Sequence, residues 1–230
     1  DHRDLHLSLR RQRQMCIRDR YNAVGQKIIF DSGRPKALEC VYLDKDNNNQ
    51  KIETIAADQF VICGGAWSSS LADSLGIKLP LVSGKGYSMT LTEPVQLPSI
   101  CSILYDARVA VTTFNCSLRF AGTMELGDND LSVNSRRING ILKSIPKYFP
   151  KFQPQHFNGV KQWSGLRPCS PDGLPYLGPA GPDRENIFIA TGHAMMGLSL
   201  APVTGKIMAD LLCGEKNEIN LKAMSPLRFN

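Results

Sequence analysis

The chain has 230 residues, 42% of them hydrophobic, which is enough to bury a sizeable core as one domain or as two intertwined domains. No uninterrupted apolar run reaches the ~18 residues of a membrane span. The seven cysteines are scattered without a CxxC pair, which argues against a disulfide framework and a zinc site. We therefore expect no bound metal and a reducing, cytoplasmic location.

The net charge of +6 is unevenly distributed. Residues 1–20 contain six arginines and three aspartates, so half of the excess lies in this leader. The leader has no hydrophobic periodicity, and its QMCIRDR run resembles translated sequencing-adapter read-through, so we expect it to be non-native or disordered. A basic tail or a transit peptide is the alternative. The remaining residues show no platform of interleaved aromatic and basic side chains, so we expect no nucleic-acid partner.

Residues 21–62 have the pattern of a small β-meander. Four strand-like runs are separated by turn-forming residues, at 27–30, 37–43, 51–55 and 59–63. The last run leads through Gly64, Gly65 and Ala66 into a helix predicted over 68–75. The glycines allow close approach of a ligand to the backbone, although a plain tight turn explains them equally well.

Residues 80–163 predict an antiparallel sheet with one covering helix. Apolar and polar residues alternate over short runs at 88–92, 104–105, 109–114 and 118–122. The helix is predicted over 134–145 from apolar positions at helical spacing, with Pro146 ending it. A further strand is predicted over 157–163.

Residues 186–214 predict a strand, a glycine turn and a helix in succession. The strand covers 187–190, and the helix has Pro202 in its first turn and Gly214 after its last. A helix N-terminus behind such a turn is suited to an anion because its first N–H groups are unpaired. An ordinary strand–helix unit without a ligand is the alternative.

Two adjacent segments carry a family resemblance: WSGLRPCSPDGLPYLGP, and after it TGHAMMGLSLAPVTGKIMADLL. They resemble the C-terminal end of the FAD-dependent D-amino acid oxidase/dehydrogenase superfamily, most of all bacterial D-amino acid dehydrogenases and more loosely glycine and sarcosine oxidases. The likeness runs from about Tyr21 to Gly214. It implies a two-domain flavoprotein of the α+β or α/β class. Residues 21–76 and 165–230 would form part of a Rossmann-like FAD-binding domain, and residues 77–164 an antiparallel-sheet substrate domain.

The resemblance also implies roles for individual residues. Arg167 corresponds to the arginine that binds the substrate carboxylate, and a planar guanidinium can hold a carboxylate through two hydrogen bonds. Tyr87 and Tyr105 are candidate hydroxyls over the substrate, although tyrosines on half-buried strands more often serve packing. His193 would position loops or cofactor rather than act as a base. The predicted FAD contacts are Gly64, Gly65, Ala66, Thr191, Gly192, His193, Met196, Gly197 and Leu198.

The activity implied by the resemblance is oxidative deamination of a D-amino acid to a 2-oxo acid and ammonia, with FAD as the hydride acceptor. Oxidative demethylation of a secondary amine and a non-catalytic flavoprotein subunit are the alternatives. The expected partner is an amino acid, and peripheral contact with the inner membrane or its quinone pool would place the protein at the cytoplasmic face. The sequence leaves the oligomeric state open.

One motif of the superfamily is missing from this sequence. The G-x-G-x-x-G cradle for the ADP half of the cofactor does not occur. We therefore expect the sequence to be a fragment that is inactive alone and does not hold FAD firmly. Stoichiometric flavin absorbance in the purified chain would contradict this expectation.

Overall fold

A computed structural model describes residues 19–43 and 50–229, so nearly all of the predicted leader lies outside the described residues. The chain divides between Asp58 and Gln59 into two compact units. The first unit is the predicted meander, an antiparallel sheet in which β2 is the central strand. Its strands are β1 (Ala23–Asp31), β2 (Arg34–Leu43) and β3 (Gln50–Ala56).

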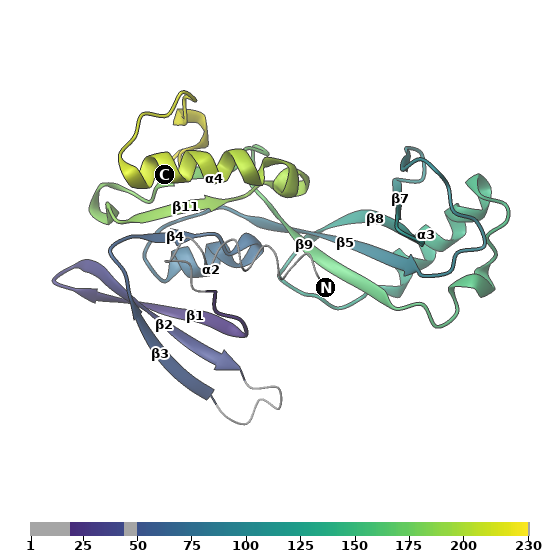
Figure 1. Ribbon diagram of the computed structural model, residues 1–230, viewed down its shortest axis with the longest axis horizontal. Helices are drawn as coiled ribbons and strands as arrows, with labels where there is room; N and C mark the ends of the chain where they lie inside the picture. Colours follow the sequence, from purple (N-terminus) through teal and green to yellow (C-terminus); the bar gives the residue numbers. More distant parts are fainter. Residues whose placement is uncertain (1–18, 44–49, 230) are drawn as a thin grey trace. The chain divides into compact units, whose positions relative to one another are not determined.

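The second unit contains a five-stranded antiparallel sheet with the order β6-β7-β8-β5-β9 (Figure 1). Its strands are β5 (Val82–Leu91), β6 (Ser102–Leu104), β7 (Val109–Phe114), β8 (Ser117–Gly127) and β9 (Gln162–Cys169). The predicted antiparallel sheet is confirmed. β5 begins at Val82, well before the predicted run at 88–92. The predicted run begins too late because Gly84 and Gly86 interrupt the alternation of side chains that marks a strand in the sequence.

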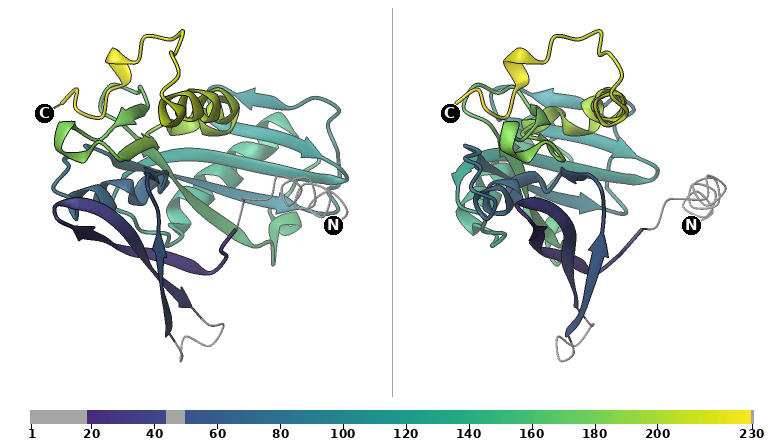
Figure 2. Two further views of the ribbon diagram at one scale, coloured as in Figure 1. Left: turned by 60° about the vertical axis from the view of Figure 1, so that its left-hand side comes forward. Right: turned by 90° about the vertical axis from the view of Figure 1, so that its left-hand side faces the viewer.

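One helix, α3 (Ser135–Tyr148), covers one face of this sheet, as Figure 2 shows. Because side chains alternate along a strand, one face of β5 and β8 meets the helix. The buried core there includes Met89, Phe120, Ile138, Ile141 and Ile145. Fully burying each such side chain stabilises the fold by about 1.5–3 kcal/mol.

Two predictions about this region are wrong. Pro146 lies inside α3 rather than ending it, because the last turn is held past the proline by a hydrogen bond from the Phe149 N–H to the Ile145 carbonyl at 2.9 Å. The strand predicted over 157–163 begins only at Gln162. Residues before it form a 3-10 turn, η2 (Pro154–Phe157), followed by Gly159 with φ +74°.

The second unit also contains a three-stranded sheet with the order β10-β11-β4. β4 (Phe60–Ile62) and β11 (Ile187–Thr191) are parallel, and β10 (Tyr176–Pro179) is antiparallel to β11. β4 leads into η1 (Gly65–Trp67) and α2 (Ser68–Asp73), whereas β11 leads into η4 (Ala194–Met196) and α4 (Gly197–Cys213). Two short 3-10 turns complete the unit, η3 (Pro182–Arg184) and η5 (Lys222–Met224).

α4 packs along this sheet (Figure 1), with Ile207 and Met208 against Leu177 and Phe188. The helix ends as predicted, since Gly214 has φ +71° in the left-handed region. Its start differs from the prediction. Because η4 leads directly into α4 at Gly197, the helix begins earlier and Pro202 lies past its first turn.

The segment Ala194–Cys213 is long and apolar enough to cross a membrane, with a mean hydropathy of 1.2 over its best window. The segment is not an uninterrupted apolar run, because Lys206 and Asp210 lie within it. Only 17% of the window is buried. Most of the α4 surface is therefore open in the described part of the chain.

The mixed α/β class is confirmed, but the compact units divide the chain at a different place from the predicted domains. Residues 21–58 belong to the first unit and residues 165–230 to the second, and the predicted assignment of domains stays a prediction. The predicted boundary at Gly165 falls inside β9, whose eight residues belong to the five-stranded sheet.

Candidate functional site

The carboxyl ends of β4 and β11 lie side by side, with Ile62 opposite Ile189 in the parallel register. Each strand then enters a glycine turn, Gly64 after β4 and Gly192 after β11. In open α/β sheets, ligands bind beyond the carboxyl ends of parallel strands. The structure therefore brings the two groups of predicted FAD contacts together, one group from each turn.

Two buried hydroxyls join these turns. Ser68 Oγ donates a hydrogen bond to Thr191 Oγ1 at 3.1 Å, and Thr191 Oγ1 donates to the Gly65 carbonyl, also at 3.1 Å. Both side chains are nearly inaccessible to solvent. Thr191 thus fixes the distance between the end of β11 and the turn after β4.

We expect Thr191→Val to destabilise the protein, because it leaves the Ser68 hydroxyl buried without an acceptor. Such an unsatisfied group costs about 1–3 kcal/mol, and each kcal/mol lowers the melting temperature by roughly 2–4 °C at this chain length. Thermal unfolding followed by circular dichroism measures the change. Thr191→Ser keeps the hydroxyl and should retain most of the stability; equal melting temperatures for Thr191→Val and the parent would contradict the assignment.

The glycines of the two turns meet different demands. Gly192 has φ +84°, and a Cβ there would lie 3.0 Å from Tyr176 Cδ2. Gly65 has φ +56°, but a Cβ there would meet nothing within 4 Å. Backbone conformation rather than crowding requires glycine at position 65. The space beside it leaves the backbone open to a ligand, which fits the predicted contact with a cofactor.

The start of α4 presents backbone N–H groups without a side-chain cap. The first turn contains no acidic residue, and Met196 at the N-cap makes no side-chain hydrogen bond to it. Leu198 is 95% exposed, and Met195 beside it is also exposed. The partial positive charge of a helix N-terminus favours an anion. Met196, Gly197 and Leu198 therefore fit the anionic end of a flavin ring together with an apolar surface for it.

His193 is held by α4 rather than free for proton transfer. Its Nε2 lies 2.9 Å from Thr204 Oγ1, and partial burial lowers the pKa of the ring below its ordinary value. The neutral form is thereby favoured. The backbone of His193 also forms a bridge with Cys169 at the end of β9. These contacts fit the predicted positioning role.

Arg167 lies on β9 directly opposite Gly84 of β5. Its guanidinium approaches Gly86 so closely that a Cβ there would lie 2.2 Å from Arg167 Nη1 and 2.5 Å from Nη2. Nη1 donates to the Gly84 carbonyl at 3.3 Å, the one hydrogen bond of this side chain within residues 19–43 and 50–229. A guanidinium has five N–H donors, so most of them are available to a carboxylate.

β9 connects this arginine to the paired turns. The strand contacts both η1 and η4, and it ends at Cys169 against the His193 backbone. Arg167 therefore lies on the strand that borders the predicted FAD contacts. Three cavities that the described residues form, of about 630, 410 and 350 Å³, are lined by residues other than Arg167 and the predicted FAD contacts.

The structure does not bring the two tyrosines to Arg167. Tyr87 is 1% exposed and lies on the opposite face of β5, in the core beneath α3, where its hydroxyl donates to Glu125 at 3.2 Å. Tyr105 follows β6 in a turn and is 87% exposed. Both placements follow from the alternation along the strands and from the short hairpin between β6 and β7, and they differ from the predicted positions over a substrate.

An ion pair between a buried lysine and an exposed aspartate, near the site, was not predicted. Lys85 is 6% exposed, and its Nζ lies 2.9 Å from Asp130 Oδ2 and 3.2 Å from the Ser132 carbonyl. Hydrogen bonds from Ser132, together with Lys85, hold the pKa of Asp130 well below its ordinary value. In the same loop, Asn129 Nδ2 donates to the Ala66 carbonyl at 3.1 Å. The loop before α3 thus anchors Ala66, one of the predicted FAD contacts. The sequence does not indicate this hydrogen bond because Asn129 and Ala66 are far apart in the chain.

Residues 21–211 match the family described as FAD dependent oxidoreductase. The chain is 31% identical to the D-amino acid dehydrogenase of Xanthobacter autotrophicus over 98% of its own length and 52% of that protein. It is 36% identical to the D-amino-acid oxidase of Bradyrhizobium diazoefficiens over 76% of its length and 42% of that protein.

Among solved structures, glycine oxidase from Geobacillus kaustophilus is similar, with a TM-score of 0.70 and 26% identity. The match covers 90% of this chain and 52% of that structure. The chain spans about half the length of these relatives. Because the family match covers most of the sequence, the chain belongs to the FAD dependent oxidoreductase family.

Proposed function

We propose that this chain forms the substrate-binding part of an FAD-dependent enzyme that oxidises a D-amino acid to a 2-oxo acid and ammonia. The observation that carries the proposal is the Arg167 guanidinium, which lies against Gly86 of β5 and makes one hydrogen bond, to the Gly84 carbonyl, within the described residues. A planar cation in this arrangement can hold an α-carboxylate through two hydrogen bonds. The names of the dehydrogenase and oxidase relatives support the choice of a D-amino acid.

FAD, when bound, would supply the acceptor for the hydride that leaves the α-carbon. The residues of this chain hold and orient the cofactor and the substrate. Gly64, Gly65 and Gly192 offer open backbone to the cofactor, and the N–H groups at the start of α4 favour negative charge. Arg167 fixes the carboxylate and thereby the direction of the α-carbon, and positioning alone can contribute about 7–11 kcal/mol of rate acceleration.

The reaction balances without a catalytic side-chain base from this chain. The substrate amine gives up a proton to solvent, the α-carbon gives up a hydride, and water then hydrolyses the resulting imino acid to a 2-oxo acid and ammonia. His193 takes no part in proton transfer under this proposal, since its ring is held by Thr204 and its pKa is lowered by burial.

A second candidate is oxidation of glycine or an N-substituted glycine. It is favoured by similarity to the glycine oxidase structure and to iminodiacetate oxidase from Chelativorans sp. BNC1, which has a TM-score of 0.68 and 25% identity. Trp163, whose ring lies over Gly165 on the face of β9 that carries Arg167, would restrict the substrate side chain in this case. The same carboxylate contact serves both candidates.

Anaerobic flavin reduction in a full-length, flavin-loaded version of the protein tests the proposal. D-alanine and larger D-amino acids should bleach the flavin absorbance, whereas their L-enantiomers should leave it unchanged. Faster bleaching by sarcosine or glycine than by any D-amino acid would favour the second candidate. Bleaching by none of these amines would contradict both.

The electron acceptor and the location belong to the same proposal. We place the enzyme in the cytoplasm or at the cytoplasmic face of the inner membrane, where oxygen or a quinone can reoxidise the flavin. The relatives include a dehydrogenase and an oxidase, so oxygen consumption during turnover, compared with reduction of a soluble quinone, separates the two acceptors.

A further inference from the structure

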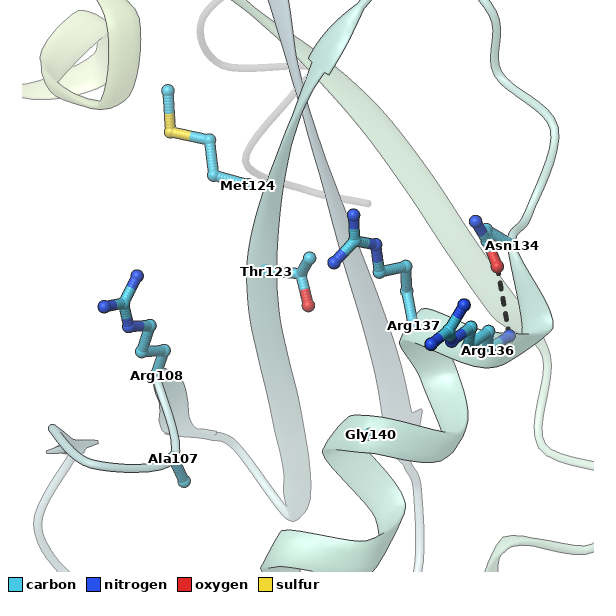
Figure 3. A pocket seen from close by; sticks show the side chains of 8 residues that line it. All are labelled: Ala107, Arg108, Thr123, Met124, Asn134, Arg136, Arg137 and Gly140. Carbon is cyan, nitrogen blue, oxygen red and sulfur yellow. Dashed lines mark hydrogen bonds between the residues drawn. The ribbon is translucent and has the colours of Figure 1, made fainter.

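The cavity of about 630 Å³ lies apart from the residues assigned to the flavin and the substrate. It is bounded by the turn before β7, by β8 and by the start of α3 (Figure 3). None of the predicted flavin or substrate residues lines it. Its volume is within the range of about 300–1,000 Å³ that is typical of small-molecule sites.

Three arginines surround this cavity. Arg108 comes from the turn before β7, while Arg136 and Arg137 come from the first turn of α3; Figure 3 shows Arg108 on one side of the β8 ribbon and the other two arginines on its other side. Arg137 Nε pairs with Glu125 at 3.2 Å. The side chains of Arg108 and Arg136 have no ion-pair or hydrogen-bond partner in the described part of the chain. No acidic residue is among those described that line the cavity.

The placement of these charges is unfavourable without a ligand. A helix N-terminus carries a partial positive charge, so arginines in the first turn of α3 are repelled there, and no acidic residue in that turn compensates. An anion bound between the guanidinium groups would be attracted both to them and to the helix N-terminus, and would offset this repulsion. A phosphate group, with its charge and its several acceptor oxygens, suits three guanidinium donors better than a single carboxylate does.

The absence of a side chain at Gly140 leaves space in the wall of the cavity. Gly140 lies inside α3, where glycine is less stable than alanine. A Cβ at this position would meet nothing within 4 Å, so packing does not require glycine. Met124 and Ala107 form an apolar part of the wall, which fits the organic portion of a ligand.

We propose that this cavity binds the phosphate group of a phosphorylated small molecule through Arg108, Arg136 and Arg137. The ligand is separate from the amino acid and the flavin. Two sources share this chemistry, a soluble phosphate ester and the headgroup of an anionic lipid.

The test is calorimetric titration of the 230-residue chain with inorganic pyrophosphate and with glycerol phosphate. We expect saturable binding that Arg136→Gln and Arg108→Gln each weaken about tenfold or more, the loss associated with one charged hydrogen bond. Lys147→Gln is the matched control, because it removes one positive charge from the last turn of the same helix, outside the cavity, and it should leave binding unchanged.

A second variant separates a shaped cavity from a general electrostatic attraction. Gly140→Leu fills the space without changing the charge, so it should abolish binding while the melting temperature stays equal or rises. Co-sedimentation with phosphatidylcholine vesicles, with and without phosphatidylglycerol, identifies the source. Binding to phosphatidylglycerol vesicles that Arg136→Gln removes, without binding of the soluble anions, would assign the phosphate to a lipid. No saturable binding in either arm, or equal effects of Arg136→Gln and Lys147→Gln, would overturn the proposal.

Discussion

Replacing Arg167 by leucine is expected to weaken amino-acid binding in the flavin-loaded protein by about a hundredfold or more. Removing one partner of a hydrogen-bonded charge pair in a partly buried site costs about 2–5 kcal/mol, and each 1.4 kcal/mol is a factor of about ten in affinity. The dissociation constant comes from the substrate dependence of anaerobic flavin reduction. Arg167→Lys keeps the charge but loses the planar fork, so it should recover only part of the affinity.

Arg119→Leu is the matched control for this prediction. Arg119 lies on β8 of the same sheet, with its guanidinium over the Phe114 ring at 4.9 Å, away from Gly86. Its replacement should leave substrate affinity unchanged. Equal affinities in Arg167→Leu and the parent would remove Arg167 from the binding site.

Gly86→Ala is expected to displace the Arg167 guanidinium and so to weaken substrate binding, with little effect on stability. The added Cβ would lie 2.2 Å from Nη1 and 2.7 Å from Cζ, far inside contact distance. The atoms displaced are the far end of a flexible side chain, which can move aside at little cost, so the melting temperature should stay close to that of the parent. Thermal unfolding and substrate titration of the same sample measure the two effects.

Two further variants show whether the clash with Arg167 is the cause. Gly127→Ala, at the end of β8 where a Cβ meets nothing within 4 Å, should change neither property. The double variant Gly86→Ala/Arg167→Ala should bind substrate no more weakly than Arg167→Ala alone, because the glycine acts only through the arginine. A further loss of affinity in the double variant would show that Gly86 acts in another way.

Much of the fold follows from local patterns. Alternation predicted β7 to the residue, and apolar spacing predicted most of α3. The errors occurred where proline or glycine stands inside an element, because such residues normally mark its end. Pro146 and Pro202 are both tolerated within helices, and Gly165 lies within β9 because the Trp163 ring covers it.

The candidate site was predictable in part, for a different reason. The motifs identified the turns at Gly64 and Gly192, and the parallel pairing of β4 and β11 brings these turns together. Which face of β5 a residue occupies depends on register, so Tyr87 could not be separated from Arg167 without the pairing of β5 with β9. The Lys85–Asp130 pair joins residues far apart in sequence, and nothing local signals it.

A crystal structure of the flavin-loaded protein with a bound carboxylate inhibitor tests the central claim most directly. The account predicts that both carboxylate oxygens accept hydrogen bonds from Arg167, with the flavin ring between this guanidinium and the N-terminus of α4. A carboxylate bound elsewhere, with Arg167 still lying on Gly86 and touching no ligand, would contradict it.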